Sequence, residues 1–289
     1  MGAPALNALM SWLIQLSLVA TKELGFKVVA IYGDPHNYCK HGFRNGKDLA
    51  ISDVNGDILM DCLLMVPQTV RVKLAAGAAD VDLFWPETAA PAPLVIVAHG
   101  FARRRHNMAG WGQHLAREGF VAAVPDLPAW SDHARNGRFV ADLRAYLCAG
   151  ESWSPRIDPA RVGLLGFSAG GLATFLASAD NPAPAVWAGL DPVDHRGMGA
   201  QAAPLVQCRA VVLTAEPSAC NGHGNARDIL AALPRVEHFS VAGAVHVDAE
   251  WPTDWKAEVV CGRSTDDRRS EFRRRATAAL REALAVAPV

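Results

Sequence analysis

The chain has 289 residues, of which 51% are hydrophobic and 20% are charged, so it can bury a sizeable core and is not expected to be mostly disordered. Its 28 Lys and Arg residues nearly balance 29 Asp and Glu residues, and the resulting net charge of −1 excludes a globally basic nucleic-acid binder. Six cysteines in this length do not form a disulfide scaffold.

The composition changes near residue 70. Residues 1–73 contain five of the six Lys residues, two of the 22 Arg residues and six Ala residues. Residues 74–289 contain one Lys, 20 Arg and 45 Ala residues. We therefore predict an N-terminal extension over residues 1–67 and a main domain over residues 68–289.

The extension begins with an uncharged stretch, residues 2–21. Apolar residues recur at helical spacing from Leu6 to Ile14, and polar residues recur four apart from Asn7 to Gln15, which predicts an amphipathic helix. A packed helix, an export segment and a membrane span are all compatible with this pattern, and one hypothesis is peripheral contact of this helix with a membrane. A signal peptide has basic residues before its apolar stretch, and this chain has no Lys or Arg before residue 22. A cytoplasmic and an exported location both stay open.

Two further elements are expected in the extension. The β-branched run Lys27–Tyr32 predicts a strand, and Asn55-Gly56 between Leu49–Ile51 and Ile58–Met60 predicts a hairpin. No catalytic motif is recognisable in these residues, so we expect a chain that begins at residue 68 to keep any catalytic activity.

Strands and helices alternate along the main domain. This alternation predicts an α/β fold with a mostly parallel sheet and helices on both faces, and ligands bind such sheets at the carboxyl ends of the strands. The expected strands are Thr69–Leu74, Asp80–Trp85, Leu94–Ala98, Phe120–Val124, Arg161–Leu165, Ala185–Leu190, Ala210–Thr214 and Val236–Val241. The expected helices are Met108–Glu118, Gly137–Cys148, Ala169–Ser178, Ala226–Leu233 and Thr265–Val286.

A G-x-S-x-G motif lies directly between a predicted strand and a predicted helix. It reads Gly166-Phe167-Ser168-Ala169-Gly170. A nucleophilic serine needs such a sharp turn to project its hydroxyl above the sheet, with small residues on either side so that strand and helix can approach. Ser168 is therefore the candidate nucleophile.

An oxyanion hole is expected after an earlier strand. The strand Leu94–Ala98 ends in His99-Gly100-Phe101, and Gly100 would let the backbone approach a reacting carbonyl. We predict that the backbone N–H groups of Phe101 and Ala169 bind the oxyanion. We interpret His99 as a structural hydrogen-bonding residue.

The general base is expected to be a histidine after the last strand, because the chain order in such enzymes is serine, acid, histidine. His246 follows Val236–Val241 and is our candidate. His238, inside that strand, and His223, in a Gly-rich loop, are weaker alternatives. Two carboxylates that follow strands, Asp191 and Glu216, are candidates for the acid. Either could reach the histidine, and strand order alone favours the later one, Glu216.

With these residues identified, residues 69–263 resemble the α/β-hydrolase superfamily, and within it the chlorophyllase-like branch. Bacterial polyester hydrolases and cutinase-like lipases are the next most similar. In chlorophyllases an Asp of the Leu-Asp-Pro-Val-Asp block is taken as the triad acid, so the resemblance favours Asp191 over Glu216. The resemblance is carried by His99–Phe101, Gly166–Gly171, Gly189–Asp194, Pro217–Asn225 and His246–Asp248.

The resemblance implies a serine esterase that uses a Ser-His-Asp triad and an acyl-enzyme, without a cofactor or metal. Its partner would be a small-molecule or lipid-like ester, and no nucleic acid. The elbow reads Phe-Ser-Ala-Gly-Gly where plant chlorophyllases usually have His-Ser-Arg-Gly-Gly. A general lipase or carboxylesterase, a polyester hydrolase and an inactive hydrolase-fold binding protein are the alternatives.

Substrate contacts are expected from the loop over residues 126–136 and from the residues after His246. Trp130, His133 and Trp251 are candidates, although each tryptophan could equally stack on substrate or anchor packing. We interpret Arg103-Arg104-Arg105 as the solvated start of a helix rather than as an anion site.

The cysteines raise one further hypothesis. Cys220 and Cys261 lie on either side of His246 in the chain, and a disulfide between them would tie the base loop to the core and imply export. The remaining cysteines are interpreted as small buried hydrophobes, namely Cys39, Cys62, Cys148 and Cys208.

Overall fold

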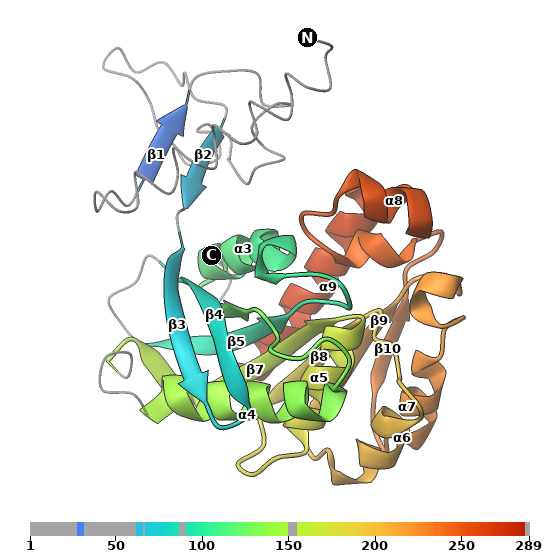
Figure 1. Ribbon diagram of the computed structural model, residues 1–289, viewed down its shortest axis with the longest axis horizontal. Helices are drawn as coiled ribbons and strands as arrows, with labels where there is room; N and C mark the ends of the chain where they lie inside the picture. Colours follow the sequence, from blue (N-terminus) through green and yellow to red (C-terminus); the bar gives the residue numbers. More distant parts are fainter. Residues whose placement is uncertain (1–27, 32–61, 66, 87–90, 150–154, 287–289) are drawn as a thin grey trace. The chain divides into compact units, whose positions relative to one another are not determined.

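The computed structural model describes residues 28–31, 62–65, 67–86, 91–149 and 155–286 (Figure 1). The chain divides into two compact units, residues 1–68 and 69–289. In the first, β1 (Val28–Ile31) pairs antiparallel with β2 (Cys62–Met65). β1 confirms the strand expected there, whereas β2 is a strand that no sequence pattern predicts. The helix expected over residues 2–21 and the Asn55-Gly56 hairpin lie outside the described residues.

The second unit is built on an eight-stranded sheet with the order β10-β9-β8-β7-β5-β6-β4-β3. The strands from β6 through β5 to β10 run parallel to their neighbours, and β4 is antiparallel to β6. The predicted α/β class with a mostly parallel sheet is therefore confirmed. The bounds are β3 (Gln68–Leu74), β4 (Gly77–Phe84), β5 (Ala92–Ala98), β6 (Val121–Pro125), β7 (Ile157–Phe167), β8 (Val186–Leu190), β9 (Arg209–Thr214) and β10 (Glu237–Ser240).

Along the chain, the sheet grows first to one side of β5 and then, from β7 onward, to its other side. The chain passes from β5 to β6 on one side, then crosses back so that β7 pairs with the opposite edge of β5. Ala98 at the end of β5 is in register with Gly166 near the end of β7. The loops that follow these two strands therefore leave the sheet side by side, at the point where ligands bind in open α/β sheets.

Helices cover both faces of this sheet (Figure 1). Gly137 of α4 packs on Leu176 of α5 on one face, and His114 of α3 is bonded to Thr277 of α9 on the other. The helix bounds are α3 (Ala109–Arg117), α4 (His133–Ala149), α5 (Ala169–Ser178), α6 (Met198–Ala202), α7 (Ala226–Ala232), α8 (Trp255–Cys261) and α9 (Asp266–Ala283). Short 3₁₀ turns are η3 (Arg105–Met108), η4 (Ala203–Leu205), η5 (Ala219–Asn221) and η6 (His246–Ala249).

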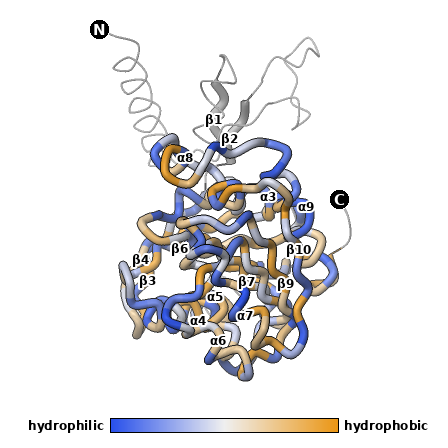
Figure 2. The backbone as a smooth tube through the Cα atoms, turned by 90° about the vertical axis from the view of Figure 1, so that its right-hand side faces the viewer, coloured by the Kyte–Doolittle hydropathy of each residue, from blue (hydrophilic) through white to orange (hydrophobic). Residues whose placement is uncertain are grey.

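The core follows the period of two that a strand imposes. Alternate residues of the central strands, such as Leu94, Ile96 and Leu164, pack with Phe139 of α4 and Phe175 of α5. On the opposite face Gly163 of β7 lies against α9, where an added Cβ would be 3.1 Å from the Leu280 side chain. Figure 2 shows hydrophobic colours in the middle of this unit, where the strands lie. Strand β5 is buried along its whole length, as its unbroken apolar sequence predicts.

The sequence patterns miss α6 and α8, although they predict α7, which has the same length as α8. Local chemistry nevertheless marks the start of α8, where the Asp254 side chain accepts from the Ala257 backbone N–H at 2.9 Å. Among the described residues, none of the helices combines the length and the apolar composition needed to cross a bilayer.

Candidate active site

Ser168 occupies a strained turn between β7 and α5. Its backbone has φ 54° and ψ −123°, a conformation rare for a residue with a side chain. The turn requires glycine on both sides, because a Cβ on Gly166 would lie 2.3 Å from the Gly170 oxygen, and one on Gly170 would lie 2.3 Å from the His99 oxygen. The G-x-S-x-G spacing thus lets β7, α5 and the loop after β5 meet at the serine.

Two more side chains complete a hydrogen-bonded chain with Ser168. His246 Nε2 lies 2.9 Å from Ser168 Oγ, and His246 Nδ1 lies 2.6 Å from Asp191 Oδ2. His246 begins η6 after β10, and Asp191 follows β8 with φ 42°. All three side chains are buried, and the Phe167 ring lies against the imidazole with ring centroids 4.7 Å apart. In this arrangement the histidine can accept the serine proton while the carboxylate fixes its tautomer.

The carboxylate of Asp191 has two further donors. Its Oδ1 accepts from the Ala215 backbone N–H at 3.0 Å, and its Oδ2 also accepts from Asn221 Nδ2 at 3.0 Å. Sequence reasoning did not single out Asn221, although it lies within the Pro217–Asn225 block noted above. Three donors therefore fix the orientation of this carboxylate.

The alternative acid and the alternative bases lie elsewhere. Glu216 is exposed and its side chain accepts from the Gly243 backbone N–H at 3.1 Å. His238 is exposed, with Nε2 2.9 Å from Thr214 Oγ1, and His223 is also exposed. His99 is buried between two backbone groups: Nε2 accepts from the Leu127 N–H and Nδ1 donates to the Gly100 oxygen, both at 2.9 Å. Burial lowers the pKa of His99, consistent with its predicted structural role.

The two candidate oxyanion donors line a common cavity of about 330 Å³. Ala169 is the first residue of α5, so its backbone N–H has no acceptor within the helix. Phe101 follows the tight approach at Gly100, where an added Cβ would lie 3.1 Å from the Phe167 ring and from Ser168 Cβ. The loop after β5 is therefore held directly over the nucleophile, and both N–H groups belong to that junction.

A second cavity, of about 380 Å³, shares Phe101 with the first as a lining residue. Ser168 and His246 line it together with apolar residues from α8 and the loop after β10, including Val247, Ala257 and Val260. Two valines of α8, Val259 and Val260, are each 76% exposed, and Figure 2 shows the hydrophobic stretch of this helix. The nucleophile thus opens toward a largely apolar cavity beside α8.

The three candidate substrate residues have different surroundings. Trp130 is 71% exposed, packs edge-to-face on Phe101 at 4.9 Å and lines the first cavity. His133 is buried in the wall of the same cavity, where burial and the neighbouring His195 lower its pKa. Trp251 lines neither cavity.

Trp251 instead packs against α3 and α9. Its indole occupies the space beside Gly110, where an added Cβ would lie 2.3 Å from the ring. The guanidinium of Arg273 stacks over the ring at 4.4 Å. Of the two roles left open for Trp251, these contacts favour the packing role.

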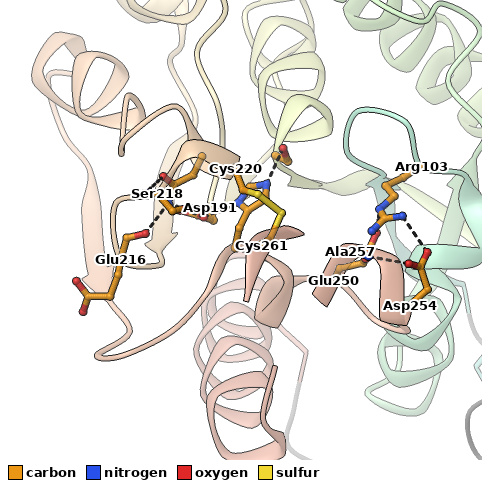
Figure 3. Close-up of a disulfide and its surroundings, with 12 residues drawn as sticks. Arg103, Asp191, Glu216, Ser218, Cys220, Glu250, Asp254, Ala257 and Cys261 are labelled. Carbon is orange, nitrogen blue, oxygen red and sulfur yellow. Dashed lines mark hydrogen bonds and ion pairs between the residues drawn. A yellow bond between two sulfur atoms is a disulfide. The ribbon is translucent and has the colours of Figure 1, made fainter. Parts of the chain in front are cut away.

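The interpretation of Arg103-Arg104-Arg105 as a solvated helix start is also wrong for two of the three residues. Arg105 pairs with Asp126 at 2.5 Å and with Asp82 at 3.2 Å. Arg103 lies 2.9 Å from both Glu250 and Asp254 (Figure 3). These ion pairs tie the loop after β5 to β4, to the end of β6 and to the residues before α8.

Glu250 is fully buried beside Arg103. Burial raises the pKa of Glu250 to about 7, and the positive charge of Arg103 only partly offsets this effect. The described residues contain no group of three His, Cys, Asp or Glu side chains arranged to hold a metal ion.

Cys220 and Cys261 form a disulfide that joins η5 to the end of α8 (Figure 3). The hypothesis of this pairing is therefore confirmed. Both cysteines line the second cavity. Cys148 and Cys208 are free and only partly buried, packed against the core, so the expectation of full burial is wrong for them. Cys39 and the Cys62 side chain lie outside what the structure describes.

No known protein-family model matches the chain, and no curated protein matches it. A functional assignment therefore depends on the geometry described above.

Proposed function

We propose that this protein is a serine hydrolase that cleaves a carboxylic ester through Ser168, His246 and Asp191. The observation that carries the proposal is the hydrogen-bonded chain between these three side chains, with the serine on a strained strand–helix turn. The parallel sheet, the serine–acid–histidine order and the loop after β5 support an α/β-hydrolase fold for residues 69–289.

The reaction would proceed in two steps. Ser168 Oγ attacks the ester carbonyl while His246 Nε2 accepts its proton, and the Phe101 and Ala169 N–H groups bind the oxyanion. The imidazolium then gives the proton to the leaving alcohol, and an acyl-enzyme remains on Ser168. Water, deprotonated by His246, then attacks this acyl group. The carboxylic acid leaves as the imidazolium returns the proton to Ser168 Oγ, which restores the serine and the neutral histidine.

The cavities support an apolar ester of modest size as the substrate. The second cavity is lined by Val247, Ala257 and Val260 near the nucleophile, and Phe101 and Trp130 form an aromatic edge at the first. Volumes of about 330 and 380 Å³ lie at the small end of ligand pockets. We expect short and medium p-nitrophenyl esters to react faster than long-chain esters, chlorophyll or a polyester film, compared in one panel.

The proposal is tested by hydrolysis of a short p-nitrophenyl ester and by labelling with a serine-reactive phosphonate. Ser168→Ala should lower kcat by at least about 10⁴-fold and abolish labelling, while keeping the wild-type unfolding temperature. Ser178→Ala is the matched control, because it removes another buried hydroxyl of α5, one bonded to the Phe175 oxygen. Full turnover in Ser168→Ala would disprove the proposal, and so would a wild type that neither hydrolyses esters nor reacts with the phosphonate.

A further inference from the structure

Asn221 lies directly behind the acid of the candidate triad. It ends η5 and only 1% of its surface is exposed. Its Oδ1 accepts from the backbone N–H groups of Ser218 at 2.8 Å and Gly224 at 3.0 Å. Its Nδ2 donates to the backbone carbonyl oxygen of Glu216 at 2.9 Å and to Asp191 Oδ2 at 3.0 Å. An amide can form four such bonds, so these contacts fix its orientation fully.

The hydrogen bond from Asn221 Nδ2 helps to set the orientation of the Asp191 carboxylate. Asp191 has φ 42°, so its backbone sits in a region that residues with side chains rarely adopt. Its Oδ2 accepts from His246 and Asn221 together, and Oδ1 accepts from Ala215. Without the amide donor, only the Ala215 N–H would hold the carboxylate besides His246 itself, and the carboxylate could rotate out of the plane in which it bonds the imidazole.

The η5 turn that carries Asn221 is itself anchored. Cys220, the preceding residue, is bonded to Cys261 at the end of α8, and Figure 3 draws this disulfide beside Asp191 and Ser218. The first residues of α8 are tied to the oxyanion loop through Asp254 and Arg103. The amide is therefore presented to the carboxylate from a cross-linked segment rather than from a free loop.

From these contacts we propose that Asn221 is a positioning residue for the acid of the reaction, holding the Asp191 carboxylate in the plane in which it bonds His246. This proposal rests on the function proposed above. It assigns to Asn221 no contact with substrate, because the amide acts entirely through Asp191.

A matched control lies four residues further along the same loop. Asn225 Oδ1 accepts from the backbone N–H of Asp194 at 2.9 Å, and its Nδ2 donates to the backbone carbonyl oxygen of Asp194 at 2.7 Å. Asn225 therefore makes bonds of the same kind, but to the backbone of a residue outside the triad. Asn225→Asp and Asn221→Asp each replace the amide donor while keeping an oxygen acceptor in place.

The experiment compares Asn221→Asp and Asn221→Ala with Asn225→Asp, because the alanine variant removes the amide donor without placing a second carboxyl group beside Asp191. Asn221→Asp should lower kcat for a short ester about tenfold to a hundredfold with little change in KM, because a bond to the charged acid is lost. Asn225→Asp should keep wild-type kcat. Asn221→Ala should lower kcat by a similar factor, and the uncharged Asn221→Leu takes its place if the alanine variant does not fold.

A second readout does not depend on ester turnover. The proton on His246 Nδ1 that bonds Asp191 should give a downfield proton resonance, which Asn221→Asp should shift or remove and Asn225→Asp should leave in place. Wild-type kcat and an unchanged resonance in Asn221→Asp would overturn the positioning role and leave the esterase function intact. A wild type without esterase activity, but with a resonance that responds only to Asn221, would overturn the function and leave the positioning role intact.

Discussion

His246 Nδ1 and Asp191 Oδ2 lie 2.6 Å apart, although 55 residues separate them in the chain. The contact exists because β8 and β10 end at the same edge of the sheet with only β9 between them. Glu216 follows β9 itself, yet its side chain turns outward to the Gly243 N–H. The choice of acid is therefore made by the direction in which each strand end turns.

The first prediction tests this choice. Asp191→Asn should lower kcat by about 10⁴-fold, since an amide in place of the carboxylate favours the wrong histidine tautomer. Glu216→Gln should lower it less than about threefold, because an exposed side chain makes only a surface bond. Steady-state kinetics of both variants on one ester decide the matter. A greater loss in Glu216→Gln than in Asp191→Asn would reverse the assignment.

The second prediction separates two tryptophans. Trp130→Ala should lower kcat/KM for aromatic or apolar esters about tenfold without changing stability, because the side chain is exposed at the cavity edge. Trp251→Ala should lower the free energy of unfolding by about 2 kcal/mol and leave KM unchanged, because its ring fills space between α3 and Arg273. Urea unfolding and ester kinetics on both variants check the two halves. The reverse pattern would contradict both assignments.

The third prediction concerns the cross-link between η5 and α8. Replacing Cys220 and Cys261 together by serine should lower the free energy of unfolding by about 4 kcal/mol, the loop-entropy value for a separation of 41 residues. It should also lower kcat, because η5 carries the amide that bonds Asp191. Cys148→Ser with Cys208→Ser is the control, since both thiols are free. Equal stability and activity in the two double variants would show that the disulfide has no such role.

The fourth prediction is a pH dependence of stability caused by Glu250. Its pKa is raised from 4.5 to about 7, so the folded state binds more protons than the unfolded state between these values. Stability from this group is present below about pH 4.5 and is lost as the pH rises through about 7, by about 3 kcal/mol in total. The unfolding free energy of Glu250→Gln relative to wild type should therefore rise over this interval, in urea titrations at several pH values. A constant difference would show that Glu250 does not titrate there.

The local features of this protein were readable from its sequence. The order of strands and helices in residues 69–289 and the placement of Ser168 between β7 and α5 depend on apolar periodicity and on glycines within a few residues. The same holds for His99, whose position after a buried strand predicts a structural bond. Such features can be predicted from the sequence because their causes lie within a single element or turn.

Other features required the tertiary structure. Asp191 and Glu216 both follow strands at the catalytic edge, so only strand order and the backbone turn at Asp191 bring one of them to His246. Asn221 was missed and the role of Trp251 was left open, because their partners are 30 residues away or lie on α3 and α9. Sequence periodicity records which face of an element is buried. Which other element covers that face, and which side chain it brings, is decided by packing across the whole sheet.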